Sequence, residues 1–254
     1  MINMKTALQL HTVRKLIAKD FWGTCQKIAD LGYQGVELTD TRALLDATDL
    51  QTRLMRMGLI PVGVHVDLEP LESELDMVLE YYRKAGINQI VCPWLPENRR
   101  ETAAAWMAMG RQLSAIGQQC RDRGFVFSYH NHAFEFAKFD GVYGLDLLLG
   151  HSDPQYLKWE LDTYWVQFGG ENPVAYMQRH AERISLLHVK DMAAGPDRKF
   201  APVGAGVLDW RAIIAAANQA GIDWLIVEQD DCYNTPPLEV AQISLKTLRK
   251  LSRP

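Results

Sequence analysis

Residues 125–136 read FVFSYHNHAFEF, an apolar run followed at once by two histidines, an asparagine and a glutamate. The run at 125–130 predicts a buried strand. His130 and His132 are two positions apart, so their imidazoles point to the same face of an extended backbone. Two imidazoles beside a carboxylate are typical of a metal site or a proton-transfer site.

Outward from this segment, the chain repeats a unit of about 30 residues: a short apolar run, a polar loop and an amphipathic helical stretch. The pattern predicts strands at residues 6–10, 35–38, 61–66, 89–93, 125–130, 157–161, 185–189 and 224–228. Helical patterns lie between them at 24–31, 72–85, 102–123 and 210–220. A glycine ends several of these stretches just before the next strand, which is the usual helix stop signal: Gly32, Gly86, Gly124 and Gly221.

Strands that alternate with helices pair in parallel, because each crossover returns the chain to the same end of the sheet. The repeated units therefore predict an α/β fold, a (β/α)8 TIM barrel that occupies residues 1–254 as one domain. A doubly wound open sheet is the alternative, but no glycine-rich phosphate loop follows the first strand. In a barrel, functional side chains are expected at the C-terminal ends of the strands.

Composition bounds the class of protein. The net charge is −4, and lysines and arginines are spread along the chain, which argues against a nucleic-acid binder. The four cysteines are widely spaced and form no CxxC pair, as expected of reduced thiols. No signal-peptide pattern and no membrane-spanning apolar run is present, so a cytoplasmic protein without a membrane partner is expected.

Polar residues end the expected strands. Five of the seven histidines fall at these ends: His11, His65, His130, His132 and His188. Asp162, His188 and Glu228 each end an apolar strand, where an unpaired buried charge costs several kcal/mol. A shared divalent cation would remove that cost, and mixed carboxylate and imidazole ligands suit Mn²⁺ first, with Mg²⁺, Co²⁺ or Zn²⁺ as alternatives. Glu160 alternates with Asp162 and is left outside this ligand set.

Other polar and aromatic side chains near the strand ends are expected to bind the substrate: His11, His65, Trp94, Trp165, Lys190 and Arg198. Arg198 lies in a loop after the seventh strand and is a candidate for binding an anionic group. The two tryptophans are equally compatible with a subunit interface, which leaves a homo-oligomer open. A metal at this place would polarise a carbonyl, and a neighbouring histidine or glutamate would move a proton. These features indicate a carbohydrate isomerase, epimerase or dehydratase that acts through an enediolate.

Six motifs in order carry a family resemblance: LQLHTVR, YHNHAFEF, WELDTYWV, LLHVKDM, PVGAGVLDW and IVEQDD. Together they resemble the sugar phosphate isomerase/epimerase group of the xylose-isomerase-like barrel superfamily, which includes inosose isomerases and dehydratases and ketose 3-epimerases. The resemblance implies one divalent metal held by Glu, Asp, His and Glu from strands five to eight. The last three match Asp162, His188 and Glu228.

The strand-five ligand departs from that pattern, because His130 stands where ketose epimerases carry a glutamate. Either His130 is the ligand, or Glu135 folds back from the loop. Glu135 is preferred, since it restores the family's usual set. By resemblance to the dehydratases, His132 is the general acid or base, with His130 and Glu228 as the other catalytic candidates.

The resemblance implies a divalent-metal-dependent isomerase or epimerase that acts on a sugar, keto-sugar or inosose. The alternative is a lyase, a dehydratase or β-eliminase, that acts on a 3-keto-sugar or keto-polyol at the same metal.

Overall fold

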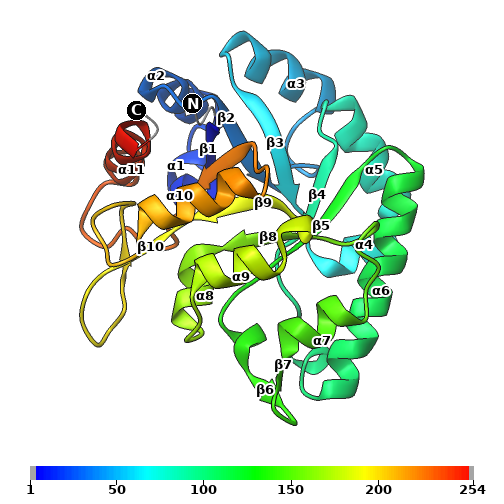
Figure 1. Cartoon of the computed structure of the whole chain (residues 1–254). Helices are drawn as coiled ribbons and strands as arrows, with labels where there is room; N and C mark the ends of the chain where they lie inside the picture. Colours follow the sequence, from blue (N-terminus) through cyan, green and yellow to red (C-terminus); the bar gives the residue numbers. More distant parts are fainter. Residues whose placement is uncertain (1–3, 252–254) are drawn as a thin grey trace.

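The computed structural model describes residues 4–251 and forms a closed parallel barrel in the strand order β1-β12-β9-β8-β5-β4-β3-β2 (Figure 1). The barrel strands are β1 (Lys5–Gln9), β2 (Gly35–Thr39), β3 (Ile60–His65), β4 (Gln89–Cys92), β5 (Val126–His130), β8 (Lys158–Asp162), β9 (Ile184–Val189) and β12 (Trp224–Val227). Their ends agree with the predicted ends to within one residue. The predicted (β/α)8 barrel is therefore confirmed.

Helices surround the barrel (Figure 1). They are α1 (Arg14–Ile17), α2 (Phe21–Leu31), α3 (Ala47–Arg56), α4 (Leu68–Ser73), α5 (Leu75–Lys84), α6 (Ala103–Asp122), α7 (Gly144–Gly150), α8 (Thr163–Phe168), α9 (Pro173–Arg179), α10 (Trp210–Gln219) and α11 (Pro237–Leu251). None of the helices between residues 4 and 251 combines the length and hydrophobicity needed to cross a bilayer.

The helix ends predicted at four glycines are confirmed. Gly32, Gly86, Gly124 and Gly221 all have positive φ, between 72° and 96°, as the left-handed stop signal requires. One helix differs from its prediction: residues 72–85 are split between α4 and α5. Glu74 separates the two helices with a φ of −132°, and its N–H donates to the carbonyl of Pro70.

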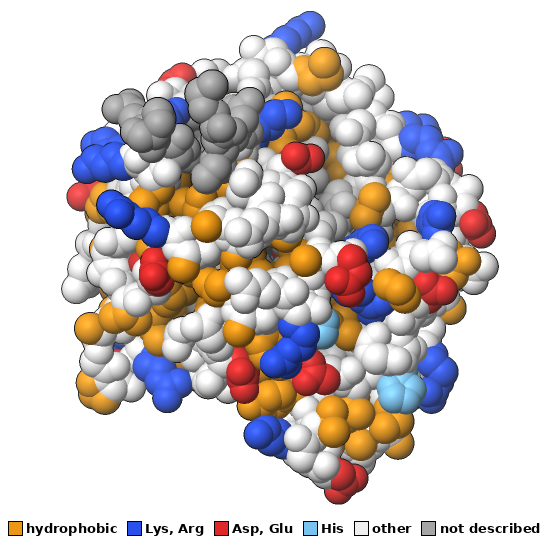
Figure 2. Space-filling view, in the orientation of Figure 1, with side chains coloured by type: hydrophobic (Ala, Val, Ile, Leu, Met, Phe, Trp, Pro, Cys, Tyr) orange, Lys and Arg blue, Asp and Glu red, His pale blue; other side chains and the backbone are white. Residues whose placement is uncertain are grey.

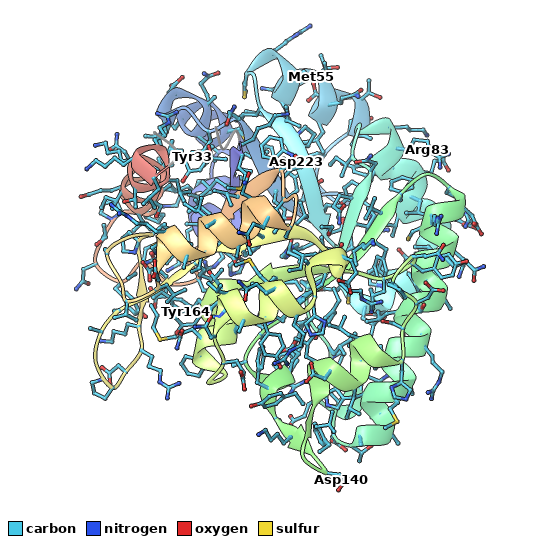
Figure 3. The ribbon with its side chains drawn as sticks, viewed as in Figure 1. Tyr33, Met55, Arg83, Asp140, Tyr164 and Asp223 are labelled. Atoms are coloured by element: carbon cyan, nitrogen blue, oxygen red, sulfur yellow. The ribbon has the colours of Figure 1, made fainter. Side chains whose placement is uncertain are left out.

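Short secondary-structure elements lie in the loops between the main strands and helices. Residues 4–251 contain four 3₁₀ turns, η1 (Leu10–Val13), η2 (Glu97–Arg99), η3 (Phe134–Phe136) and η4 (Ala181–Arg183). They also contain two hairpins, β6 (Lys138–Phe139) with β7 (Val142–Tyr143) and β10 (Asp191–Met192) with β11 (Phe200–Ala201). Asp140 marks the tip of the first hairpin, which projects away from the barrel (Figure 3). On the face shown in Figure 2, charges of both signs are interspersed, so this face presents no single-sign field.

Two β-bulges decide which side chains point into the barrel. Val36 pairs with Pro61 but Glu37 pairs with Gly63, so Val62 has no partner. In the same way, Trp159 pairs with Ile184 but Glu160 pairs with Leu186, which leaves Ser185 unpaired. An extra residue exchanges the two faces of all that follows on its strand. The bulges therefore turn the later residues His65 on β3 and His188 on β9 toward the interior.

The interior of the barrel is apolar in one part and polar in another. Five small or branched apolar side chains from five strands form a cluster of their own: Ala7, Val62, Val91, Leu186 and Ile226. This packing is the usual filling of such a barrel. Buried polar groups that include Gln9, Glu37, Glu160 and His188 occupy other inward positions, and they form the base of the site described next.

Candidate metal centre

A cavity of about 610 Å³ opens at the C-terminal ends of the strands. Its lining residues are His11, Thr39, Asp40, His65, Asp67, Pro93, Trp94, His130, His132, Glu228 and Asp230. Predicted site residues contribute six of them: His11, His65, Trp94, His130, His132 and Glu228. Three more, Asp162, His188 and Lys190, are buried and contact the lining residues His130 and Glu228.

Four buried side chains converge at the base of the cavity. His130, Asp162, His188 and Glu228 each offer one ligand atom, and these atoms lie within 4.8 Å of one another. His130 Nε2 lies 3.9 Å from Asp162 Oδ2, and His188 Nδ1 lies 3.1 Å from Glu228 Oε2. The four side chains come from β5, β8, β9 and the residue after β12, which are neighbours around the barrel. We call this set the upper group.

Asp162 shows that the upper group fits a cation. Its Oδ1 accepts a hydrogen bond from Trp165 N at 2.9 Å and so caps α8. Its Oδ2 is buried and has no hydrogen-bond partner among the described residues. Burial raises the pKa of Asp162 to about 7. Because a buried oxygen without a hydrogen bond is costly, a divalent ion among these four donors would satisfy Oδ2 and both imidazoles.

Lys190 places a positively charged ammonium group among the carboxylates of the site. Its Nζ lies 2.9 Å from Glu228 Oε2, 2.7 Å from Asp230 Oδ1 and 3.5 Å from Asp162 Oδ2. The side chain is 1% exposed and lies against the ring of Trp165. Although burial alone would lower it, the three carboxylates hold the pKa of Lys190 above its usual range. The ammonium group is therefore neutralised within the site.

A second group of donors lies on the other side of the same imidazoles. Glu160 Oε2 is 2.9 Å from His130 Nδ1 and 2.8 Å from His65 Nε2. Glu37 Oε2 is 2.6 Å from His188 Nε2 and accepts a hydrogen bond from Gln9 Nε2 at 2.8 Å. Both glutamates are fully buried. We call these two carboxylates the inner pair.

The inner pair is negatively charged. Burial alone would raise the pKa of Glu37, but the charges of His65 and His188 hold it well below its usual range. The charges of His188 and His65 likewise lower the pKa of Glu160, against burial and the charge of Glu37. Conversely, the two carboxylates raise the pKa of His65 to about 10, although burial alone would lower it.

Glu135 lies apart from the upper group. Its Oε1 accepts a hydrogen bond from Tyr129 Oη at 2.5 Å, and its Oε2 accepts one from His132 N at 2.8 Å. Burial raises the pKa of Glu135 to about 8, so the carboxyl is mostly neutral at pH 7. The structure thus brings His130, and not Glu135, to the other three ligand atoms.

His132 lines the cavity next to the upper group. Its ring stacks on Phe134 at 5.5 Å and lies 5.4 Å from the ring of Trp165. Nδ1 is buried and has no partner between residues 4 and 251. Burial, with the charge of Lys190, lowers the pKa of His132 to about 3. The imidazole is therefore neutral at physiological pH.

The remaining predicted substrate residues differ in position. Trp94 lines the cavity and is 43% exposed, so its ring is open to a ligand. Arg198 is exposed, and its guanidinium donates to the carbonyl of Phe168 at 2.9 Å. Its own carbonyl accepts a hydrogen bond from Tyr164, which is labelled in Figure 3. Arg198 thus supports the loop beside α8 and is absent from the cavity lining.

Sequence reasoning considered Glu160 but left it outside the site, and it assigned no role to Glu37 or Asp191. Glu37 and Glu160 are acidic residues inside apolar strands, and that signal was available for both. Asp191 accepts hydrogen bonds from Gly204 N, Gly206 N and Trp210 Nε1, and so organises the segment that contains the PVGAGVLDW motif. A side chain at Gly206 would collide with the Asp191 carboxylate, which explains that glycine.

Comparisons with known proteins agree with this fold. The inosose dehydratase of Lacticaseibacillus casei is 26% identical over 161 residues, which are 56% of this chain and 53% of that protein. The chain spans about half the length of the curated relatives that it matches.

Two solved structures show the same fold. A sugar phosphate isomerase/epimerase from Parabacteroides distasonis ATCC 8503 has a TM-score of 0.84 at 22% identity, over 97% of this chain and 98% of that one. The IOLI protein with a bound zinc atom has a TM-score of 0.76 at 15% identity, over 98% of each chain. The model of the xylose isomerase-like TIM barrel family matches residues 25–251. Because that match covers most of the sequence, this chain belongs to the xylose isomerase-like TIM barrel family.

Proposed function

We propose that the chain is a divalent-metal-dependent isomerase or epimerase that acts on an uncharged sugar, keto-sugar or inosose. One observation carries the proposal: the ligand atoms of His130, Asp162, His188 and Glu228 lie within 4.8 Å of one another at the base of the cavity. In this proposal His130 is the ligand from β5, and Glu135 is a structural residue.

The proposed ligand set favours certain metals. Two imidazoles and two carboxylates form a mixed nitrogen and oxygen set, which suits Mn²⁺, Co²⁺ and Zn²⁺ better than Mg²⁺. The zinc bound by one structural neighbour supports this range. A bound divalent ion would supply Lewis-acid polarisation of a substrate carbonyl and of the hydroxyl beside it.

The cavity supports an uncharged polyhydroxyl substrate. Its lining residues include no lysine or arginine, and the nearby Lys190 is already paired with carboxylates. Asp67 and Asp230 at the lining would repel a phosphate group but accept hydrogen bonds from hydroxyl groups. Trp94 offers an exposed ring face to the apolar side of a sugar.

His132 is the proposed proton carrier. Its neutral imidazole lines the cavity and is in the form that accepts a proton. Negative charge that develops on the substrate as a C–H proton leaves would stabilise the protonated ring. Return of that proton to the neighbouring carbon, together with transfer of the hydroxyl proton from one substrate oxygen to the other, completes an isomerisation. Return of a proton to the opposite face of the same carbon, an epimerisation, would require a second carrier.

A lyase is the second candidate, favoured by the curated dehydratase at 26% identity. In that reaction His132 removes the same proton, and a hydroxyl or glycosidic substituent leaves from the next carbon. The experiment incubates Mn²⁺-loaded protein with inososes and 3-keto-sugars in D₂O and follows the products by NMR. Deuterium incorporation without elimination of water or of a substituent supports isomerisation or epimerisation. An α,β-unsaturated ketone supports the lyase. If no candidate exchanges a proton or reacts, while the wild type binds Mn²⁺, the proposed substrate class is wrong.

A further inference from the structure

His130 and His188 each contact two groups through their two ring nitrogens. His130 presents Nε2 to Asp162 and Nδ1 to Glu160. His188 presents the opposite atoms, Nδ1 to Glu228 and Nε2 to Glu37. The two imidazoles of the upper group therefore form a layer between its two carboxylates, Asp162 and Glu228, and the inner pair.

The carboxylate beside each imidazole determines which ring nitrogen carries the proton. A histidine that binds a metal through one nitrogen carries its proton on the other, and a carboxylate that accepts that proton fixes the tautomer and the ring orientation. Glu160 Oε2 lies 2.9 Å from His130 Nδ1, and Glu37 Oε2 lies 2.6 Å from His188 Nε2, both at hydrogen-bond distance. With their protons on these inner nitrogens, His130 would present a lone pair on Nε2 beside Asp162, and His188 would present one on Nδ1 when a cation replaces its hydrogen bond to Glu228.

Neighbouring residues fix the two glutamates in turn. Gln9 Nε2 donates to Glu37 Oε2 at 2.8 Å, and His65 Nε2 lies 2.8 Å from Glu160 Oε2. Gly63 keeps room for Glu37, because a Cβ at that position would lie 2.9 Å from Glu37 Oε1. The rotamers of both glutamates are thus constrained by groups that do not belong to the upper group.

We propose that Glu160 and Glu37 are positioning residues for the metal centre. Glu160 holds His130 with its proton on Nδ1 so that Nε2 binds the ion, and Glu37 holds His188 with its proton on Nε2 so that Nδ1 binds it. The inference rests on the proposed function, since it takes the upper group as the ligand set. His65, His130, Glu160 and His188 also lie close enough together to hold a metal, and Oε1 of each glutamate of the inner pair has no hydrogen-bond partner among the described residues. In this proposal the ion binds at the upper group, and the inner pair holds the two imidazoles.

Calorimetric titration with Zn²⁺ and Co²⁺ tests whether the inner pair strengthens metal binding. Glu160→Gln and Glu37→Gln should weaken binding by roughly 10–100-fold, the usual cost of losing such a partner. Glu135→Gln is the matched control, since Glu135 is equally buried and contacts neither imidazole of the layer. Its affinity should stay within about threefold of the wild type. Wild-type affinity in both glutamine variants would overturn the inference, and absence of binding by the wild type would overturn the proposed function as well.

Long-range ¹H–¹⁵N NMR of histidine-labelled, Zn²⁺-loaded wild type tests the tautomers without any substitution. His130 should show an Nδ1–H and a metal-shifted Nε2, and His188 should show the reverse. The same tautomer in both rings would overturn the inference while leaving the metal site intact. A stoichiometry of two zinc ions per chain would also overturn it, because Glu160 would then be a ligand.

Discussion

Two buried carboxyl groups at the same end of the barrel have opposite surroundings. Glu135, in the turn after β5, has both oxygens occupied by Tyr129 Oη and His132 N. Asp162, at the end of β8, has one oxygen occupied and one without a hydrogen-bond partner in the described part of the chain. Burial raises the pKa of both groups, Glu135 to about 8 and Asp162 to about 7.

The difference lies in what faces each carboxyl. Asp162 Oδ2 faces the ammonium group of Lys190 and the ring of His130, whereas Glu135 faces a phenol and a backbone amide. A buried carboxyl whose oxygens are all hydrogen-bonded is part of the structure, and one with an open oxygen among other donors is available to a cation. Position at a strand end alone does not separate the two cases.

The largest effect is expected from Lys190→Met in metal-free protein. The change leaves Asp162 and Glu228 without their buried cation, which should cost about 3–5 kcal/mol in the free energy of unfolding. Urea unfolding in the presence of a chelator measures this loss, and saturating Mn²⁺ should recover part of it by binding the folded state. Lys199→Met is the control, because Lys199 is exposed and should change stability by less than about 0.5 kcal/mol. Equal losses in the two variants would refute the role given to Lys190.

Asp162→Asn distinguishes the roles of the two carboxylate oxygens of that residue. The amide oxygen can still accept the hydrogen bond from Trp165 N, so α8 should keep its cap. Loss of the charge on Oδ2 should weaken Mn²⁺ binding by about 100-fold or more, above the usual cost of losing an outer partner. Calorimetry and thermal unfolding together check this. Unchanged affinity in a folded variant would exclude Asp162 as a ligand.

His130→Gln and Glu135→Gln compare the two candidates for the β5 ligand directly. Mn²⁺ affinity should fall about tenfold or more in the first variant, a loss of roughly 1.4 kcal/mol. In the second it should change by less than about threefold, because both hydrogen bonds of Glu135 have counterparts in glutamine. The opposite ranking would return Glu135 to the ligand set.

A further effect concerns pH and Glu135. Its pKa is about 8 in the folded chain against an ordinary 4.5, so the folded state binds this proton more tightly. Its contribution to stability is therefore complete below pH 4.5 and is lost as pH rises toward 8, by up to roughly 1.4 kcal/mol per pH unit. Glu135→Gln should gain stability relative to the wild type between pH 5 and pH 8 when both are unfolded in urea with chelator. A stability difference that stays constant over this range would show that the folded pKa is not raised.

The sequence alone determined much of the frame. Alternating apolar runs and helical stretches predicted each barrel strand to within one residue, because local hydrophobic periodicity and glycine stop signals mark these elements. The same reading put His130, Asp162, His188 and Glu228 at one end of the barrel, since strand ends follow directly from strand positions. The ligand roles of these residues remain predictions.

Only the tertiary structure decided how those residues face one another. Glu37 and His188 lie 151 positions apart, and the bulge at Ser185 turns His188 toward the interior, where the two meet. A bulge depends on how neighbouring strands fit the closed barrel, and a single extra residue exchanges the faces of the strand. Likewise, nothing local shows that Glu135 hydrogen-bonds Tyr129 while His130 faces Asp162. Periodicity along the chain determines which residues reach the site, and long-range packing determines which of their atoms are left free to bind.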